Sequence, residues 1–196
     1  MSKENFKNAI ALTGGIATGK STVCNLLKLH GFLTIDADKI AHKLLDNHSA
    51  KIAAMFGEHY VQNGKVLRKE LGKIIFSDEN EKKRLEAFIH PLIKEEIIKE
   101  AVIFEKAQKP YFIDIPLFFE TMNYDISKSL VVYTPSKIQC ERLMKRDSIK
   151  KEEALQKMSN QMDIEKKKEL ADLCIDNSST LKNLQNEVER VIGEIL

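Results

Sequence analysis

One short string constrains this chain more than any other feature. A brief apolar run at 9–13 leads into two glycines, and a helical pattern of apolar residues follows from Val23 onward. Between them the sequence matches GxxxxGK[ST] in full, as Gly14-Gly15-Ile16-Ala17-Thr18-Gly19-Lys20-Ser21. In such a P-loop, backbone N–H groups and the positive end of the next helix surround phosphates. The string predicts a nucleoside triphosphate site; the plainer interpretation is a glycine-rich turn.

The residue types of the loop suggest separate tasks. Lys20 can reach the β and γ phosphate oxygens, and Ser21 can bind Mg²⁺. We therefore expect ATP and Mg²⁺ as cofactors, with residues 14–21 and the following Thr22 as the cofactor-binding segment. The strings DxxG, NKxD and GxGxxG are absent, which argues against a guanine-nucleotide switch and a dinucleotide-binding protein. A small-molecule kinase is the class that remains.

Apolar runs and helical patterns alternate along the chain, which predicts a three-layer α/β fold with a parallel five-stranded sheet. The expected strands are 9–13, 32–35, 111–115, 129–133 and 173–175. Roughly 70 residues between the second and third strands look helical, with breaks at Gly57 and Asn63-Gly64, and that is too long for a plain crossover. We expect a core of 1–38 and 111–196, a helical acceptor subdomain of 39–110 and a lid of 142–168.

Composition excludes several partners. Lys and Arg number 31 and Asp and Glu 29, a net charge of +2, so no overall basic field exists to hold nucleic acid. No apolar run reaches the ~18 residues of a membrane span, and the polar start MSKENFKN does not resemble a secretory leader. We expect a cytoplasmic protein with no nucleic acid, membrane or obligate protein partner.

The cysteines do not suggest a metal site or a disulfide framework. Cys24, Cys140 and Cys174 are odd in number, far apart and never arranged as CxxC. We interpret them as reduced packing residues.

Carboxylates follow two of the expected strands. Asp36 and Asp38 come after the second strand and Asp114 lies near the end of the third, at the sheet edge where ligands bind in open α/β folds. One carboxylate can deprotonate an acceptor hydroxyl, and we assign Asp38 as this base. Asp36 is the structural or metal-linked partner, and one of the two can instead cap the next helix. Asp114 either holds Mg²⁺ or orients the P-loop.

Several further strings, in this order, resemble the dephospho-coenzyme A kinase family. They are residues 11–16, 36–41, His90-Pro91, 114–120, 139–142 and 171–177. The resemblance extends from about Ile10 to Ser178, and a generic P-loop kinase would not carry the full set.

The resemblance implies ATP-dependent phosphorylation of the ribose 3′-hydroxyl of dephospho-CoA, which yields coenzyme A and ADP in the last step of coenzyme A synthesis. It implies a P-loop kinase core with a helical CoA domain and a lid. Asp38 matches the family's base, His90 and Arg68 match its coenzyme-side positions, Arg142 faces the transferring phosphates, and Asn177 lies in the adenine-side loop.

Plainer interpretations stand beside these roles. His90 before Pro91 can be a turn histidine packed between helices. Arg142 and Arg146, four apart on one helix face, can be solvated, or they can form an arginine fork over the developing phosphate charge. The charged run 145–168 is either a solvated helical face or a lid held mainly by polar contacts.

The chain departs from the family pattern at two places. Lys157 stands where the family usually has a lid arginine, and lysine cannot make a planar bidentate contact. Ala17-Thr18 replaces the common Gly-Ser pair, and we expect the cradle to survive if φ at Ala17 is negative. The alternative functions are a nucleoside monophosphate or other small-molecule P-loop kinase and, in a different class, a nucleotide-dependent binding or regulatory module.

Overall fold

The computed structural model describes residues 6–196, so part of the polar N-terminal string, residues 1–5, lies outside it. The described residues form two compact units, one made of 6–35 together with 101–196 and the other of 36–100. The second boundary falls inside helix α5 (Glu79–Glu105) rather than at 110/111, because a helix that continues between units carries no turn signal there.

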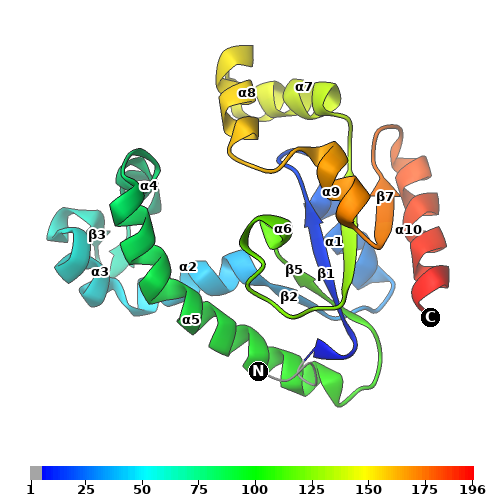
Figure 1. The fold of residues 1–196 in the computed structure, drawn as a ribbon, viewed down its shortest axis with the longest axis horizontal. Helices are drawn as coiled ribbons and strands as arrows, with labels where there is room; N and C mark the ends of the chain where they lie inside the picture. Colours follow the sequence, from blue (N-terminus) through cyan, green and yellow to red (C-terminus); the bar gives the residue numbers. More distant parts are fainter. Residues whose placement is uncertain (1–5) are drawn as a thin grey trace. The chain divides into compact units, whose positions relative to one another are not determined.

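A five-stranded sheet forms the centre of the first unit (Figure 1). Its strands are β1 (Ala9–Gly14), β2 (Thr34–Asp36), β5 (Tyr111–Asp114), β6 (Lys128–Tyr133) and β7 (Leu173–Asp176), in the order β2-β5-β1-β6-β7. β1 pairs in parallel with β5 and β6, and β6 pairs in parallel with β7. The predicted parallel five-stranded α/β fold is confirmed.

Alternate residues of the strands face two different helical layers, as the two-residue period of a strand requires. On one face, Leu12, Val132 and Ile175 pack with helices α1 (Lys20–Leu29) and α10 (Leu181–Ile195). On the other face, Val131 and Tyr133 pack with Ile164 of helix α9 (Ile164–Leu170). The central strands are therefore covered on both faces, and the loops at their carboxyl ends are left to form a site.

Three further helices of this unit are α6 (Phe118–Thr121), α7 (Ser136–Asp147) and α8 (Lys151–Ser159). An apolar cluster joins α7 and α8 to the P-loop: Cys140, Leu143 and Ala154, with Ile16, Ala17, Met144, Ile149 and Met158. The expectation that 142–168 is held mainly by polar contacts is therefore wrong, because this segment supplies apolar residues that pack under the loop.

The second unit contains α2 (Ala37–Asn47), α3 (Ser49–Phe56), a 3-10 turn (Glu58–Tyr60), β3 (Val61–Gln62), β4 (Lys65–Val66), α4 (Arg68–Ser77) and most of α5. Its core forms around Ile52, Val66 and Leu71. It is not purely helical, because β3 and β4 pair as an antiparallel hairpin. Asn63 and Gly64 both have positive φ, 51° and 73°, which is the conformation that a tight hairpin turn requires.

Helix α5 continues through Pro91, which lies exposed inside it. His90 is therefore a helical residue, half-buried, and the interpretation of it as a turn histidine is wrong.

Two smaller expectations concern cysteines and membranes. Cys24 and Cys140 are buried, Cys174 is half-buried, and all three are free thiols. Among residues 6–196, no helix is both long enough and apolar enough to cross a membrane.

Candidate active site

The P-loop connects the end of β1 directly to the start of α1. Gly19 is the N-cap of α1 with φ 87°, and Lys20 is the first helical residue. The Thr18 amide and hydroxyl both donate to the Gly15 carbonyl, at 3.3 and 2.9 Å, and this closes the turn. The first turn of α1 has no acidic residue, so its positive end is left for an anion.

At two positions of the loop, other side chains come so close to the backbone that only glycine fits. A Cβ at Gly15 would lie 2.5 Å from Gln139 Oε1, and a Cβ at Gly19 would collide with the Asn177 amide nitrogen. Gly19 also has the positive φ that side chains disfavour. The glycines thus let the loop pass close to helix α7 and to the loop that follows β7.

Ala17 has φ 60°, so the condition of a negative φ does not hold. The loop curls through the left-handed region at this residue, and its methyl group packs with the apolar cluster of α7 and α8. Ala17 therefore carries backbone strain of roughly 1–2 kcal/mol, which surrounding contacts must offset.

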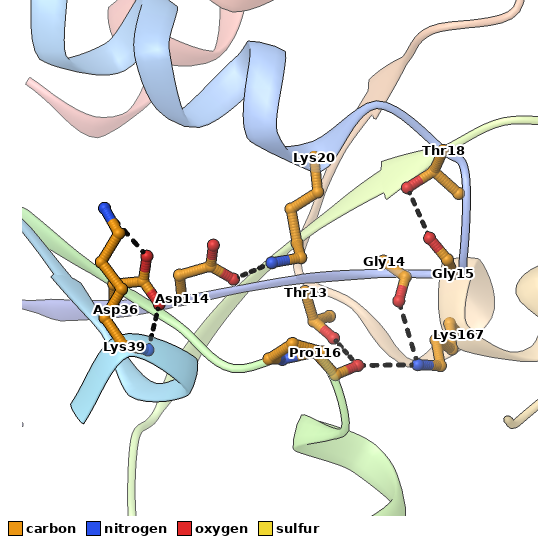
Figure 2. Close-up of polar contacts among 10 residues, drawn as sticks. All are labelled: Thr13, Gly14, Gly15, Thr18, Lys20, Asp36, Lys39, Asp114, Pro116 and Lys167. Atoms are coloured by element: carbon orange, nitrogen blue, oxygen red, sulfur yellow. Dashed lines mark hydrogen bonds and ion pairs between the residues drawn. The ribbon is translucent and has the colours of Figure 1, made fainter. Parts of the chain in front are cut away.

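Lys20 forms an ion pair with Asp114 at the end of β5 (Figure 2). The sheet register places Leu12 of β1 opposite Asp114, which brings this carboxylate to the edge where the P-loop begins. Both side chains are mostly buried, 17% and 11% exposed. The pair orients the Lys20 ammonium at the base of the loop.

A set of hydrogen bonds holds the far side of the loop. The Thr18 carbonyl accepts from Asn177 Nδ2 at 2.8 Å and from the Thr134 hydroxyl at 3.2 Å. Arg142 donates to the Asn177 carbonyl at 2.9 Å. The structure thus brings Arg142 and Asn177 together beside the P-loop.

Arg146 and Lys157 gather at a different place. Arg146 lies 2.8 Å from Asp147, and Lys157 lies 3.4 Å from the same carboxylate. Arg146 and, more weakly, Lys157 hold the pKa of Asp147 below its ordinary value. Arg142 and Arg146 therefore have separate partners and do not form a fork in this structure.

The acceptor-side residues belong to the second unit. Asp36 is the N-cap of α2 and accepts the Lys39 N–H at 2.9 Å, while Asp38 lies exposed in the first turn of that helix. Arg68 lies 3.2 Å from Asp46, which also accepts the Val66 N–H. The structure thus gives Asp36 the capping role that one of the two aspartates was expected to have.

The residues expected to hold Mg²⁺ fit a hard cation with few protein ligands. Ser21 offers an exposed hydroxyl in the first turn of α1, and Asp114 offers a carboxylate beside Lys20. In the part of the chain that the structure describes, no group of three or more His, Cys, Asp or Glu side chains could hold a metal. Mg²⁺ that binds mainly to nucleotide phosphates and water needs no such cage.

Comparison with known proteins identifies the family. A family model described as dephospho-CoA kinase matches residues 8–183. The chain belongs to the dephospho-CoA kinase family. This family carries out the final step of coenzyme A biosynthesis, and the chain is accordingly an enzyme of the kinase class, as the resemblance implied.

Relatives of the family are similar over nearly the full chain. The dephospho-CoA kinase of Helicobacter pylori (strain 26695) is 50% identical over 194 residues, covering 97% of this chain and 99% of the relative. That of Sulfurimonas denitrificans is 50% identical over 190 residues, covering 97% and 95%. The solved dephospho-CoA kinase of Campylobacter jejuni has 37% identity and a TM-score of 0.75, with 96% of each chain covered.

Sequence reasoning missed a buried lysine behind the P-loop. Lys167 lies in the charged run 145–168, but its side chain is 0% exposed and lies 2.8 Å from Glu120. Burial lowers its pKa, while the Glu120 carboxylate raises it. The available clue was spacing, since Lys167 lies three residues after Ile164 and four before Ala171, which both pack on the sheet.

Proposed function

We propose that this chain transfers the γ-phosphoryl group of ATP to the ribose 3′-hydroxyl of dephospho-CoA, giving coenzyme A and ADP, with Mg²⁺ as its metal. The observation that carries the proposal is the Lys20–Asp114 pair at the base of a curled P-loop, in a chain of this family. A loop of this shape binds phosphate oxygens through backbone N–H groups, and Lys20 adds a positive charge where negative charge develops.

The phosphate side uses residues of the first unit. Residues 14–22 surround the triphosphate, and Asn177 and Arg142 support the far side of the loop through the Thr18 and Asn177 carbonyls. Bound Mg²⁺, held by Ser21 and Asp114, would neutralise charge on the phosphates. Arg146 and Lys157, which share Asp147, supply further cations when residues 142–168 act as a lid.

The acceptor side uses Asp38, with Asp36, Arg68 and His90 as substrate-binding residues. The 3′-oxygen attacks the γ-phosphorus, the bond from that phosphorus to the bridging oxygen of ADP breaks, and the hydroxyl proton passes to a carboxylate. Asp36 accepts the N-cap hydrogen bond of α2 and so has a structural role. We assign the proton to Asp38, which matches the base of the family.

The test is ADP release from ATP and Mg²⁺ with separate acceptors: dephospho-CoA, AMP, CMP and shikimate. We expect ADP release with dephospho-CoA and with none of the other three acceptors. The product should be identical to coenzyme A. Folded Lys20→Ala is the matched control and should lose turnover, because the charge at the phosphates is gone. Comparable rates with AMP, or with shikimate, would reject the proposal.

A further inference from the structure

Lys167 is a charged side chain placed where water cannot reach it. Its ammonium donates to the Gly14 carbonyl at 3.2 Å and the Pro116 carbonyl at 3.0 Å (Figure 2). It also lies 2.8 Å from Glu120 Oε1. An ammonium has three N–H donors, so these three acceptors satisfy it completely. Burying a charge is costly unless it is fully partnered, and here the partners include the first peptide of the P-loop.

The bond to Gly14 has a geometric consequence. In a trans peptide the carbonyl and the following N–H point in opposite directions. When Lys167 holds the Gly14 carbonyl, the Gly15 N–H is turned to the other side of the chain. Two successive glycines can rotate this peptide at low cost, so the orientation needs an external support.

Glu120 extends the support to a second loop. Its Oε1 also accepts the Met162 N–H at 3.0 Å. The neighbouring Gln161 accepts the Ile16 N–H at 2.7 Å through its side-chain oxygen. The Gly14 carbonyl and the Ile16 amide are therefore held by groups that meet at the Lys167–Glu120 pair.

Lys167 also contacts the segment that follows β5, the strand that carries Asp114. Pro116 lies two residues beyond Asp114, and its carbonyl accepts from both Lys167 and the Thr13 hydroxyl, the latter at 3.0 Å. The end of β1 and the segment after β5 are thus joined below the loop by one buried cation.

We propose that Lys167, paired with Glu120, is a positioning residue for phosphoryl transfer, which orients the Gly14–Gly15 peptide and, through Met162, the loop that carries Gln161. It acts through the P-loop backbone and touches no reacting atom. The inference rests on the proposed function only in that the P-loop binds the transferred phosphate.

The decisive variant is Lys167→Met with Glu120→Gln. Lys167→Met alone leaves a carboxylate without its cation and can fail to fold, whereas the double variant leaves two neutral side chains and keeps an acceptor for Met162. Lys166→Met is the matched control, because Lys166 is the preceding residue of the same helix and is exposed. Thermal unfolding and circular dichroism establish that each variant is folded.

Two measurements follow. We expect kcat of the folded double variant to fall about 10- to 100-fold at saturating ATP, which is less than the ~10²–10³-fold cost of losing a preorganised donor, because the Gly15 N–H is misoriented rather than removed. KM for dephospho-CoA should stay within about 3-fold. The Gly15 and Ile16 amide resonances in ¹⁵N spectra should move, while those of β6 stay. Lys166→Met should match the wild type in both.

A folded double variant with unchanged kcat and unmoved Gly15 and Ile16 amides would overturn the proposal. So would a loss of activity that only follows the folded fraction, because that describes a structural lysine. If the wild type fails to phosphorylate dephospho-CoA, the proposed function fails by itself. The amide shifts and ATP affinity by calorimetry would still decide the role of Lys167.

Discussion

At the residue scale, the P-loop depends on side chains that tolerate an unusual backbone. Ala17 has a positive φ, and its methyl group packs with Cys140 and Leu143. The left-handed backbone conformation of Ala17 destabilises the loop, whereas the packing of its methyl group stabilises it. The loop therefore keeps its curl through tertiary contacts rather than through the conformational preference of alanine.

This balance predicts that the loop tolerates Ala17→Gly but not Ala17→Val. Ala17→Gly removes strain and loses a methyl contact, so the free energy of unfolding should change by less than about 1 kcal/mol. Ala17→Val adds a β-branched side chain in the left-handed region and should lower it by about 2 kcal/mol and weaken ATP binding. Urea unfolding and ATP titration measure both. A valine variant as stable as the wild type would contradict the strained loop.

The two aspartates of the acceptor side make a second prediction at this scale. Asp38→Asn keeps the size of the side chain but loses its basicity, so kcat should fall roughly 10²-fold or more with ATP affinity little changed. Asp36→Asn should retain much of kcat, because asparagine is also a good N-cap. Steady-state kinetics of both variants decide, and the reverse pattern would exchange the two roles.

At the element scale, helix α10 secures strand β7 at the edge of the sheet. Glu187 accepts the Asp176 N–H at 3.3 Å and pairs with Arg190 at 2.9 Å, and Arg190 donates to the Cys174 carbonyl at 2.7 Å. Asn177, which holds the P-loop, directly follows this strand. The contacts of α10 thus hold β7 in place, and through β7 they stabilise the loop that carries Asn177.

The pH dependence of this contact follows from its charge. The Arg190 guanidinium, together with the Asp176 N–H, holds the pKa of Glu187 below its ordinary 4.5. A lowered carboxyl pKa stabilises the fold above the unfolded value, and the gain is lost as pH falls through the folded value. Glu187→Gln should therefore cost about 0.5–1 kcal/mol at pH 7 and progressively less below about pH 4.5.

Thermal unfolding from pH 7 to pH 3 measures this difference. Glu189→Gln is the matched control, since Glu189 lies exposed on the same helix. A cost of Glu187→Gln that stays constant down to pH 3 would mean that the ion pair does not contribute.

At the scale of the whole molecule, phosphoryl transfer requires that water be excluded from the γ-phosphate. Residues 142–168 carry Arg142, Arg146 and Lys157, and part of this segment packs on Ile16 and Ala17 through the apolar cluster. We expect the apolar cluster to keep the segment folded and its charged face to respond to ligands.

Hydrogen exchange tests this expectation. Exchange across 142–168 should be faster in the free protein and slow when ATP is bound together with a dephospho-CoA analogue that lacks the 3′-hydroxyl. The strands β1 and β6 serve as internal references. Equal exchange with and without ligands would reject the lid and leave the kinase activity untouched.

The sequence alone determined the features that depend on local chemistry. The P-loop follows from eight consecutive residues, and the strands follow from short apolar runs that lie within two residues of β1, β2, β5, β6 and β7. The ordered set of family strings was sufficient to predict the family. Each of these signals is contained in a few neighbouring residues, so no long-range contact was needed to interpret it.

The tertiary structure decided what depends on distant partners. In the sequence, Lys167 looks like one more surface charge. Only the fold brings its side chain to the Gly14 carbonyl, 153 residues away in the chain. Ala17 has a positive φ at a place where α7 and α8 pack on the loop, and Arg142 donates to the Asn177 carbonyl, 35 residues away, rather than forming a fork with Arg146. In each case the contact joins residues far apart in the chain, through burial, charge pairing or hydrogen bonding, and no local pattern of residues encodes that.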